Sequence, residues 1–220
     1  MKSQRLPLPH HRQHPAHPER AYHGLVATGG AYDYGYGPYS AEDLFDLPDE
    51  GKSFELVHGW LIELTPSSRH DFVANQLRRA IEHAAEGAGA GVYVQSPMDI
   101  STPAGVRRPD VGVIDAEVAA TVRQLGISLY QGVDLLLAVE VVSRGSGSER
   151  EDRVRKVHEY AEAGIRQYWV VDFDPRPRIQ IRLLEGDRYG EPTTLGERDT
   201  LKVSDPFPIC FELSVLADFS

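Results

Sequence analysis

From Tyr39 onward, apolar and polar residues alternate in the way expected of a domain built from helices and strands. Short apolar runs separated by turn residues predict strands at about 54–57, 60–64, 92–95, 98–100, 111–114, 135–142, 168–173 and 179–184, and a closing strand pair that ends at 210–213. The run Leu135–Val142 is almost continuously apolar, which is typical of a central strand covered on both faces. The pattern therefore predicts an α/β fold with a mixed central β-sheet flanked by α-helices.

Three helices are predicted between these strands. Ser40 can cap a short helix that ends before Pro48, and Ser67 or Ser68 can cap a longer helix that runs to about Glu86 and ends at a series of glycines. A third helix is predicted for about 149–163. Its expected features are a capping box of Ser148 and Glu151, an apolar stripe of Val154, Val157 and Ala161, and a stop at Gly164.

The first 38 residues differ from the rest in composition. Residues 1–20 hold four Pro, four His and four basic side chains against one acidic one, and Tyr and Gly then cluster up to Tyr39 without a helix or strand period. Neither stretch can bury enough apolar surface to offset the entropy of ordering it. We predict a mostly disordered extension over 1–38 and one folded domain over 39–220.

Charge and composition narrow the function classes. The chain has 33 acidic and 23 basic residues and a formal charge of −10, which argues against coating nucleic acid through bulk positive charge. The single Cys210 excludes an internal disulfide and a cysteine-based zinc cluster. Because no apolar run is long enough for a membrane span and the first residues lack a signal sequence, we expect a cytoplasmic protein that does not act in a membrane.

Two carboxylates and a lysine form the candidate chemistry. Glu140 interrupts the apolar run 135–142, and Asp110 opens the strand predicted at 111–114, so neighbouring strands would bring both into one cleft. Lys156 and Tyr160 share one face of the third helix, with Asp152 one turn earlier. Hard oxygen ligands with a nearby lysine are the groups needed for Mg²⁺- or Mn²⁺-assisted phosphodiester hydrolysis.

A purely structural interpretation stays open at this point. Asp110 would then pair with Arg107 or Arg108, Glu140 would be the buried partner of Lys156, and Asp152 and Lys156 would form an exposed helix pair.

Four motifs in order resemble the Uma-type family of bacterial candidate endonucleases, within the PD-(D/E)XK restriction-endonuclease-like superfamily. They are FELVHGWLIEL from Phe54, RPDVGVI from Arg108, LAVEVVS from Leu137 and KVHEYAEAGIRQYWVVD from Lys156, and the resemblance covers about 40–216. It implies a restriction-endonuclease-like core, with Asp110 as the acidic residue of the "PD" and Glu140 as that of the "(D/E)XK". Glu55 resembles the upstream glutamate of the family, and His70 also matches a family position.

One position departs from the superfamily pattern. Val142 stands where the lysine of the "(D/E)XK" is expected, and the family resemblance allows Lys156 on the following helix to supply it. The resemblance thus implies a Mg²⁺- or Mn²⁺-dependent deoxyribonuclease with Asp110 and Glu140 as metal ligands and Lys156 and Glu55 as further catalytic residues. Nucleic acid, most simply DNA, is the implied partner, and a homodimer is compatible because many nucleases of this superfamily act as pairs.

Two other functions remain compatible with the sequence. A non-catalytic interaction or nucleic-acid-binding module is favoured by Val142 and by the acidic balance of the chain, and a metal-dependent hydrolase could act on a different phosphoester. An expected rim of arginines near the candidate ligands suits a nucleic-acid substrate: Arg107, Arg108, Arg144, Arg150, Arg153 and Arg155.

Overall fold

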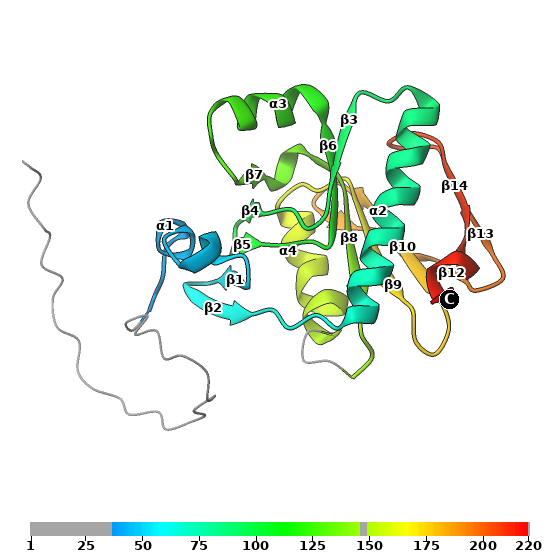
Figure 1. Cartoon of the computed structure of the whole chain (residues 1–220), viewed down its shortest axis with the longest axis horizontal. Helices are drawn as coiled ribbons and strands as arrows, with labels where there is room; N and C mark the ends of the chain where they lie inside the picture. The colour runs from blue at the N-terminus through cyan, green and yellow to red at the C-terminus, as the bar shows by residue number, and fades with distance from the viewer. Residues whose placement is uncertain (1–36, 146–148, 220) are drawn as a thin grey trace, which may run out of the picture. The chain divides into compact units, whose positions relative to one another are not determined.

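A large mixed sheet forms the centre of the protein (Figure 1). The computed structural model describes residues 37–145 and 149–219, so the predicted disorder of 1–38 lies almost wholly outside the described residues and stays a prediction. The sheet has the order β11-β10-β9-β8-β6-β3, and β12 also pairs with β10. Its strands are β3 (Val92–Gln95), β6 (Val111–Asp115), β8 (Leu135–Val142), β9 (Gln167–Asp172), β10 (Arg178–Glu185), β11 (Arg188–Tyr189) and β12 (Thr193–Gly196).

The strand directions confirm the predicted mixed sheet. β8 and β9 run parallel, whereas β6 and β3 on one side of β8 and β10 beyond β9 pair antiparallel to their neighbours. Seven of the eight residues of β8 are buried, and Leu136 is half-buried. A strand covered on both faces must be apolar on both faces, which explains the continuous apolar run in the sequence.

A second, smaller sheet packs beside the first, whereas the sequence pattern predicted a single central sheet. Its order is β2-β1-β5-β4-β7, and a two-stranded sheet of β13 and β14 closes the chain. The elements are β1 (Phe54–Val57), β2 (Trp60–Glu63), β4 (Ile100–Thr102), β5 (Gly105–Arg107), β7 (Tyr130–Gln131), β13 (Thr200–Val203) and β14 (Ile209–Glu212). Strands of two or three residues such as β5 and β7 carry too little periodicity to be recognised in the sequence.

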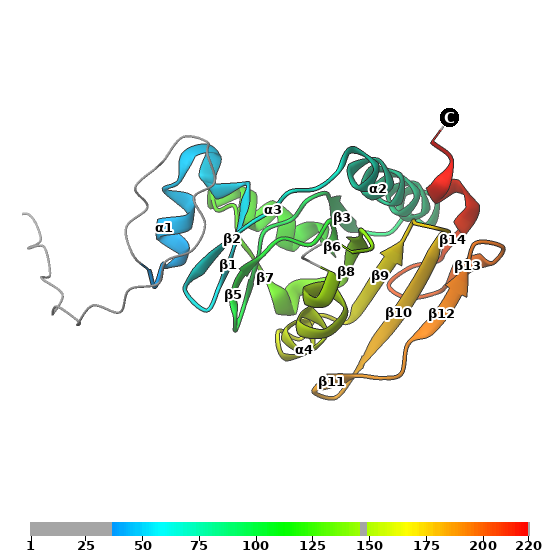
Figure 2. The same ribbon diagram turned by 90° about the horizontal axis from the view of Figure 1, so that it is seen from below.

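Helices cover the two faces of the large sheet (Figure 2). α2 (Ser68–Ala88) packs on one face, over an apolar core that includes Leu77, Val139 and Trp169. α4 (Lys156–Glu162) lies on the opposite face, where a second core contains Ala138, Val142 and Tyr160. From Ala138 onward the even-numbered residues of β8 therefore face α4, and Glu140 is among them.

The two predicted N-terminal caps are confirmed. Ser40 and Asp43 form a complete capping box at the start of α1 (Ala41–Phe45), which is followed by the 3₁₀ turn η1 (Pro48–Gly51). Ser67 accepts a hydrogen bond from the His70 amide at the start of α2, which ends at the left-handed Gly89. The structure also contains α3 (Ala116–Gln124), which Asp115 caps. The sequence pattern did not predict this helix, because strand signals precede and follow it.

The third predicted helix differs from expectation. Residues Glu151–Arg155 (η3) form one π-helical turn before α4 begins, and the predicted cap Ser148 lies outside the described residues. The wider turn changes the face that points inward: Val154 is 48% exposed, whereas Asp152, Lys156 and Tyr160 are buried. The predicted apolar stripe of Val154, Val157 and Ala161 is thus wrong at Val154.

The remaining connections are short. The 3₁₀ turns η2 (Gly132–Asp134) and η4 (Leu213–Ala217) precede β8 and follow β14. Among the described residues, no helix combines the length and the apolar character that crossing a membrane requires.

Candidate active site

Strand pairing places the two candidate ligands on adjacent strands. Val111 of β6 pairs with Val139 of β8, so Asp110 lies beside the strand position of Glu140. Oδ2 of Asp110 accepts a hydrogen bond from the Val141 amide at 2.7 Å, which belongs to the peptide unit directly after Glu140. The charge of Asp110 is also felt at Glu140, where it contributes to raising the pKa of that side chain. The structure thus brings the two carboxylates together, as the sequence predicts.

The Lys156 ammonium lies at the centre of a buried carboxylate cluster. Its Nζ is 2.9 Å from Glu140 Oε1, 3.1 Å from Glu55 Oε1 and 3.1 Å from Asp152 Oδ1. An ammonium has three N–H donors, so three carboxylates can saturate it. We refer to Glu55, Glu140, Asp152 and Lys156 as the carboxylate–lysine cluster. Lys156 comes from α4 and occupies the site left open by Val142, which is buried in the apolar core.

The π-helical turn explains how Asp152 reaches this cluster. A turn with i→i+5 bonding changes the angular position of the residues before it, and such turns occur often at functional sites. Asp152 is 3% exposed and forms an i,i+4 ion pair with Lys156. The open alternative of an exposed helix pair is therefore wrong. Tyr160, one turn later, donates a 2.6 Å hydrogen bond to Glu140 Oε1.

Arg107 is a fully buried cation next to the cluster. It donates to Glu55 Oε2 at 2.9 Å and makes a two-pronged contact of 2.7 Å per bond with Glu159 of α4. Arg107 therefore does not belong to an exposed basic rim, and neither Arg107 nor Arg108 pairs with Asp110. Arg108 instead pairs with Asp99, and its amide donates to Glu55 Oε1.

His70, at the start of α2, is the side-chain partner of Asp110. Its Nε2 lies 3.1 Å from Asp110 Oδ2, and its Nδ1 lies 3.3 Å from Asp71 Oδ1. Burial lowers the pKa of His70, but the hydrogen bond and charge of Asp110, helped by Asp71, outweigh it and raise the pKa to about 9. The imidazole is therefore an additional positive group on the Asp110 side of the site.

Burial and charge act in opposite directions on the cluster. Burial raises the pKa of Glu140 well above its usual value, and the neighbouring Asp152, Asp110 and Glu55 add to that effect. Burial also opposes ionisation of Glu55, but Lys156 and Arg107 overcome it and lower its pKa. For Lys156, burial lowers the pKa, but the surrounding carboxylates raise it well above its usual value. Lys156 thus remains charged throughout the physiological range.

The two candidate ligands each keep one oxygen without a protein partner. Asp110 uses Oδ2 and Glu140 uses Oε1, and no hydrogen bond from residues 37–145 or 149–219 reaches Asp110 Oδ1 or Glu140 Oε2. Carboxylate oxygens are the ligands that Mg²⁺ prefers, and it commonly uses one or two of them with water. The residues therefore fit a divalent cation, although the same described segments contain no group of three or more His, Cys, Asp or Glu side chains in a metal-binding arrangement.

The structure thus brings all four predicted site residues together. Lys156 contacts Glu55 and Glu140 directly, and Asp110 is linked to them through the Val141 amide. Arg107 and Glu159 were missed as a pair because they are 52 positions apart in the sequence. In the sequence, Arg107 stood out only as a member of the expected arginine rim and as a possible partner of Asp110.

Comparisons with known proteins agree with this fold. A family model described as "Uma2: Putative restriction endonuclease" matches residues 41–216. Among solved structures, the chain is similar to a protein from Anabaena variabilis described as "a putative nuclease belonging to DUF820", with a TM-score of 0.65, 14% identity, and coverage of 82% of this chain and 98% of that chain. At this identity the similarity shows the fold, and it confirms the predicted α/β nuclease-type core. No curated protein matches the chain.

Proposed function

Since this chain belongs to the Uma2 family, as its sequence motifs predict, we propose that it is a metal-dependent endonuclease that hydrolyses phosphodiester bonds in DNA. The family and the solved neighbour both support nuclease function in general. The observation that carries the finer proposal is that Asp110 and Glu140 lie side by side, each with one oxygen that no described residue hydrogen-bonds, and that Glu140 contacts the Lys156 ammonium.

Asp110 and Glu140 are the proposed ligands for Mg²⁺ or Mn²⁺. Hydrogen bonds from the Val141 amide and His70 hold Asp110, while Lys156 and Tyr160 hold Glu140, so both free oxygens keep fixed positions. A divalent cation bound there would polarise the phosphate and lower the pKa of water.

Lys156 supplies positive charge in a water-poor site, where electrostatic stabilisation of a phosphate transition state is most effective. Its charge stabilises the developing negative charge, or it orients the attacking water once one of the three carboxylates gives up its contact with Nζ. Glu55 assists by holding the ammonium at 3.1 Å, and Glu55 is itself fixed by Arg107 and the Arg108 amide. Contacts with three carboxylates therefore fix the position of the lysine side chain.

A second function, a non-catalytic binding module, is favoured by a specific observation. Glu140 is already bonded to both Lys156 and Tyr160, so the cluster is electrostatically satisfied to a large extent without a metal. In this alternative the protein binds no divalent cation, and Lys156→Ala leaves nucleic-acid binding unchanged.

Calorimetric titration of Mn²⁺ and DNA cleavage separate the two functions. We expect the wild type to bind Mn²⁺ and to cleave DNA, and Asp110→Ala and Glu140→Ala to lose both activities while thermal melts show that they remain folded. Asp187→Ala is the matched control, because that carboxylate is 98% exposed on the β10–β11 turn.

Each alternative result has a definite meaning. Cleavage that persists in both variants refutes the assignment of the site. Absence of Mn²⁺ binding in folded wild-type protein supports the binding module. Metal-dependent turnover of a small phosphoester that DNA does not inhibit identifies a different hydrolase.

A further inference from the structure

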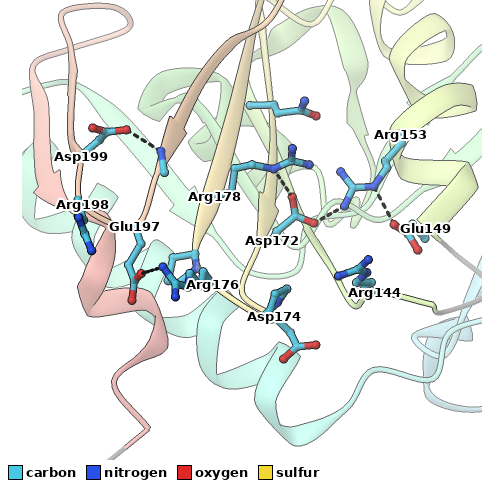
Figure 3. A pocket seen from close by; sticks show the side chains of 14 residues that line it. Arg144, Glu149, Arg153, Asp172, Asp174, Arg176, Arg178, Glu197, Arg198 and Asp199 are labelled. Atoms are coloured by element: carbon cyan, nitrogen blue, oxygen red, sulfur yellow. Dashed lines mark hydrogen bonds and ion pairs between the residues drawn. The ribbon is translucent and has the colours of Figure 1, made fainter.

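A hollow lined by five arginines lies at the C-terminal ends of β8 and β9, and its residues have no part in the proposed chemistry (Figure 3). Its volume is about 780 Å³, and its arginines are Arg144, Arg153, Arg176, Arg178 and Arg198. A second hollow of about 680 Å³ adjoins it, shares Arg176 and Arg198 with it, and reaches Glu212 at the end of β14, so the two are taken together as one groove. We call this the arginine groove.

The groove begins on the same sheet face as the proposed metal ligands. Asp172 at its floor pairs with Val142 in the parallel β8–β9 ladder, and Val142 shares its face with Glu140. Glu140 pairs with Val170 on the neighbouring strand, and Asp172 lies two residues further along that strand. With ordinary strand spacings, the Cα atoms of Glu140 and Asp172 are about 8 Å apart. If a phosphate of a nucleic-acid strand binds at Glu140, the next nucleotide along the strand would therefore reach the groove.

Acidic residues in the groove mainly hold the arginines in place. Asp172 accepts from Arg178 Nε at 3.0 Å and from Arg153, while Arg153 also donates to Glu149 at 3.1 Å. A guanidinium has five N–H donors, so Arg178, whose side chain is 45% exposed, keeps donors for a ligand. The remaining acids are partly occupied as well: Glu197 pairs with Arg176, and Asp199 accepts from the Gly196 amide.

Two arginines on opposite sides of the first hollow have no partner among the described residues. No hydrogen bond or ion pair links Arg144 or Arg198 to another of the described residues, and both are solvent-exposed (Figure 3). Among the acids that line the groove, the side chains of Asp174 and Glu212 likewise make no hydrogen bond or ion pair with another of the described residues. Two unpaired guanidinium groups on either side of one hollow suit a ligand with more than one phosphate, because the planar guanidinium binds phosphate with two parallel hydrogen bonds.

We propose that the arginine groove binds the sugar–phosphate backbone of the DNA strand where it continues beyond the cleavage position. This inference rests on the proposed endonuclease function and adds how the substrate strand is held. The net negative charge of the chain disfavours DNA binding in general, and the first hollow itself holds five arginines and five carboxylates, so binding there depends on the guanidinium groups that remain unpaired.

Fluorescence anisotropy with a labelled DNA duplex in EDTA measures binding without cleavage. For each phosphate contact, the logarithm of the DNA association constant falls by about 0.9 per tenfold rise in salt concentration. One contact therefore contributes about eightfold more affinity at 0.1 M salt than at 1 M. We expect Arg144→Ala and Arg198→Ala each to weaken binding about fivefold to tenfold and to reduce the salt slope by about one. Arg188→Ala is the matched control, because that arginine is 86% exposed beyond the opposite end of β10.

A change of opposite sign sharpens the test. Asp174→Asn removes an uncommitted negative charge from the groove, so DNA should bind more tightly and dissociate more slowly. A general loss of folding quality cannot produce this gain.

Cleavage in Mg²⁺ or Mn²⁺, measured in parallel, separates this inference from the proposed function. If the wild type binds and cleaves DNA but the groove variants bind as tightly as the wild type, the inference is overturned and the proposed function stands. If the wild type binds no DNA, the inference is overturned, and the cleavage assay decides whether the endonuclease proposal falls with it.

Discussion

At the scale of single residues, the unusual feature is how many charges this protein buries in one place. Glu55, Arg107, Glu140, Asp152 and Lys156 are all less than 5% exposed. Such charges persist inside a protein only when each is paired, because an unpaired buried ion is strongly unfavourable. Here every member contacts an opposite charge at 3.1 Å or less. Replacement of buried ion pairs by apolar residues of similar volume is often neutral or stabilising for the fold. The network is therefore better explained by function than by stability.

His70 gives the pH dependence that is easiest to observe. Its pKa in the folded protein is about 9 against 6.5 as the ordinary value, so ionised His70 stabilises the fold fully below 6.5 and this contribution is lost as the pH rises toward 9. We expect His70→Gln to destabilise the protein below pH 6.5 and to have little effect above pH 9, in urea unfolding with EDTA present. NMR titration of the imidazole should show a midpoint near 9 that falls in Asp110→Asn. A midpoint at or below 6.5 in the wild type would contradict the contact.

At the scale of elements, Arg107 joins the small sheet to the helix that carries Lys156. Its guanidinium extends from β5 to Glu55 of β1 and to Glu159 of α4. The cation thus fixes the position of α4 relative to the strand that bears Glu55, and both elements contribute directly to the site.

Removal of that link should be costly. Arg107→Met removes one of two cationic partners of the buried Glu55 and the two-pronged partner of the partly buried Glu159, and we expect the free energy of unfolding to fall by about 3–5 kcal/mol, measured by urea denaturation. Arg107→Lys keeps the charge but loses the two-pronged contact with Glu159, so its loss should be smaller. Arg188→Met, on an exposed strand, should change stability by less than about 0.5 kcal/mol. Equal effects of the two methionine substitutions would refute a structural role for Arg107.

Gly105 permits the close approach of β5 and β1. Its φ is 136°, and a Cβ at this position would lie 2.3 Å from the Leu56 carbonyl oxygen. Gly105→Ala should therefore cost about 2 kcal/mol or more. Gly87→Ala, in α2 with no atom within 4 Å of the added carbon, should instead stabilise by about 0.5–1 kcal/mol. Thermal or urea unfolding of the two variants checks the opposite signs, and a stabilising Gly105→Ala would contradict the observed backbone conformation.

At the scale of the whole molecule, charge is distributed unevenly along the chain. The first 20 residues carry a net charge of +3 and the remaining 200 carry −13. The folded part is thus repelled by nucleic acid on average, which makes local groups such as the arginine groove decisive for binding.

The predicted independence of the N-terminal extension is testable at this scale. Because 1–38 are expected to bury little apolar surface, deletion of residues 1–36 should leave the melting temperature unchanged. The same deletion removes positive charge, so DNA affinity should decrease modestly at low salt and be unaffected at high salt. A large fall in melting temperature would show that the extension packs against the domain.

The sequence by itself determined the elements with strong periodicity or clear caps and the identity of the acidic residues. β8 was predictable to the residue from its apolar run, and Glu140 was conspicuous because a charge interrupts that run. Asp110 was found from its place at a strand start, and the family followed from four motifs in order. All of these signals are local, so a pattern within about ten residues is enough to carry them.

Only the tertiary structure decided which charges meet. The π-helical turn turned Asp152 and Lys156 inward and Val154 outward, and no local pattern distinguishes this from a regular amphipathic helix. The partnership of Arg107 with Glu159, of His70 with Asp110, and the assembly of the arginine groove depend on strands far apart in the sequence. The physical reason is that a buried charge is stabilised by whatever opposite charge the fold brings within about 3 Å, and that choice belongs to packing and not to sequence spacing.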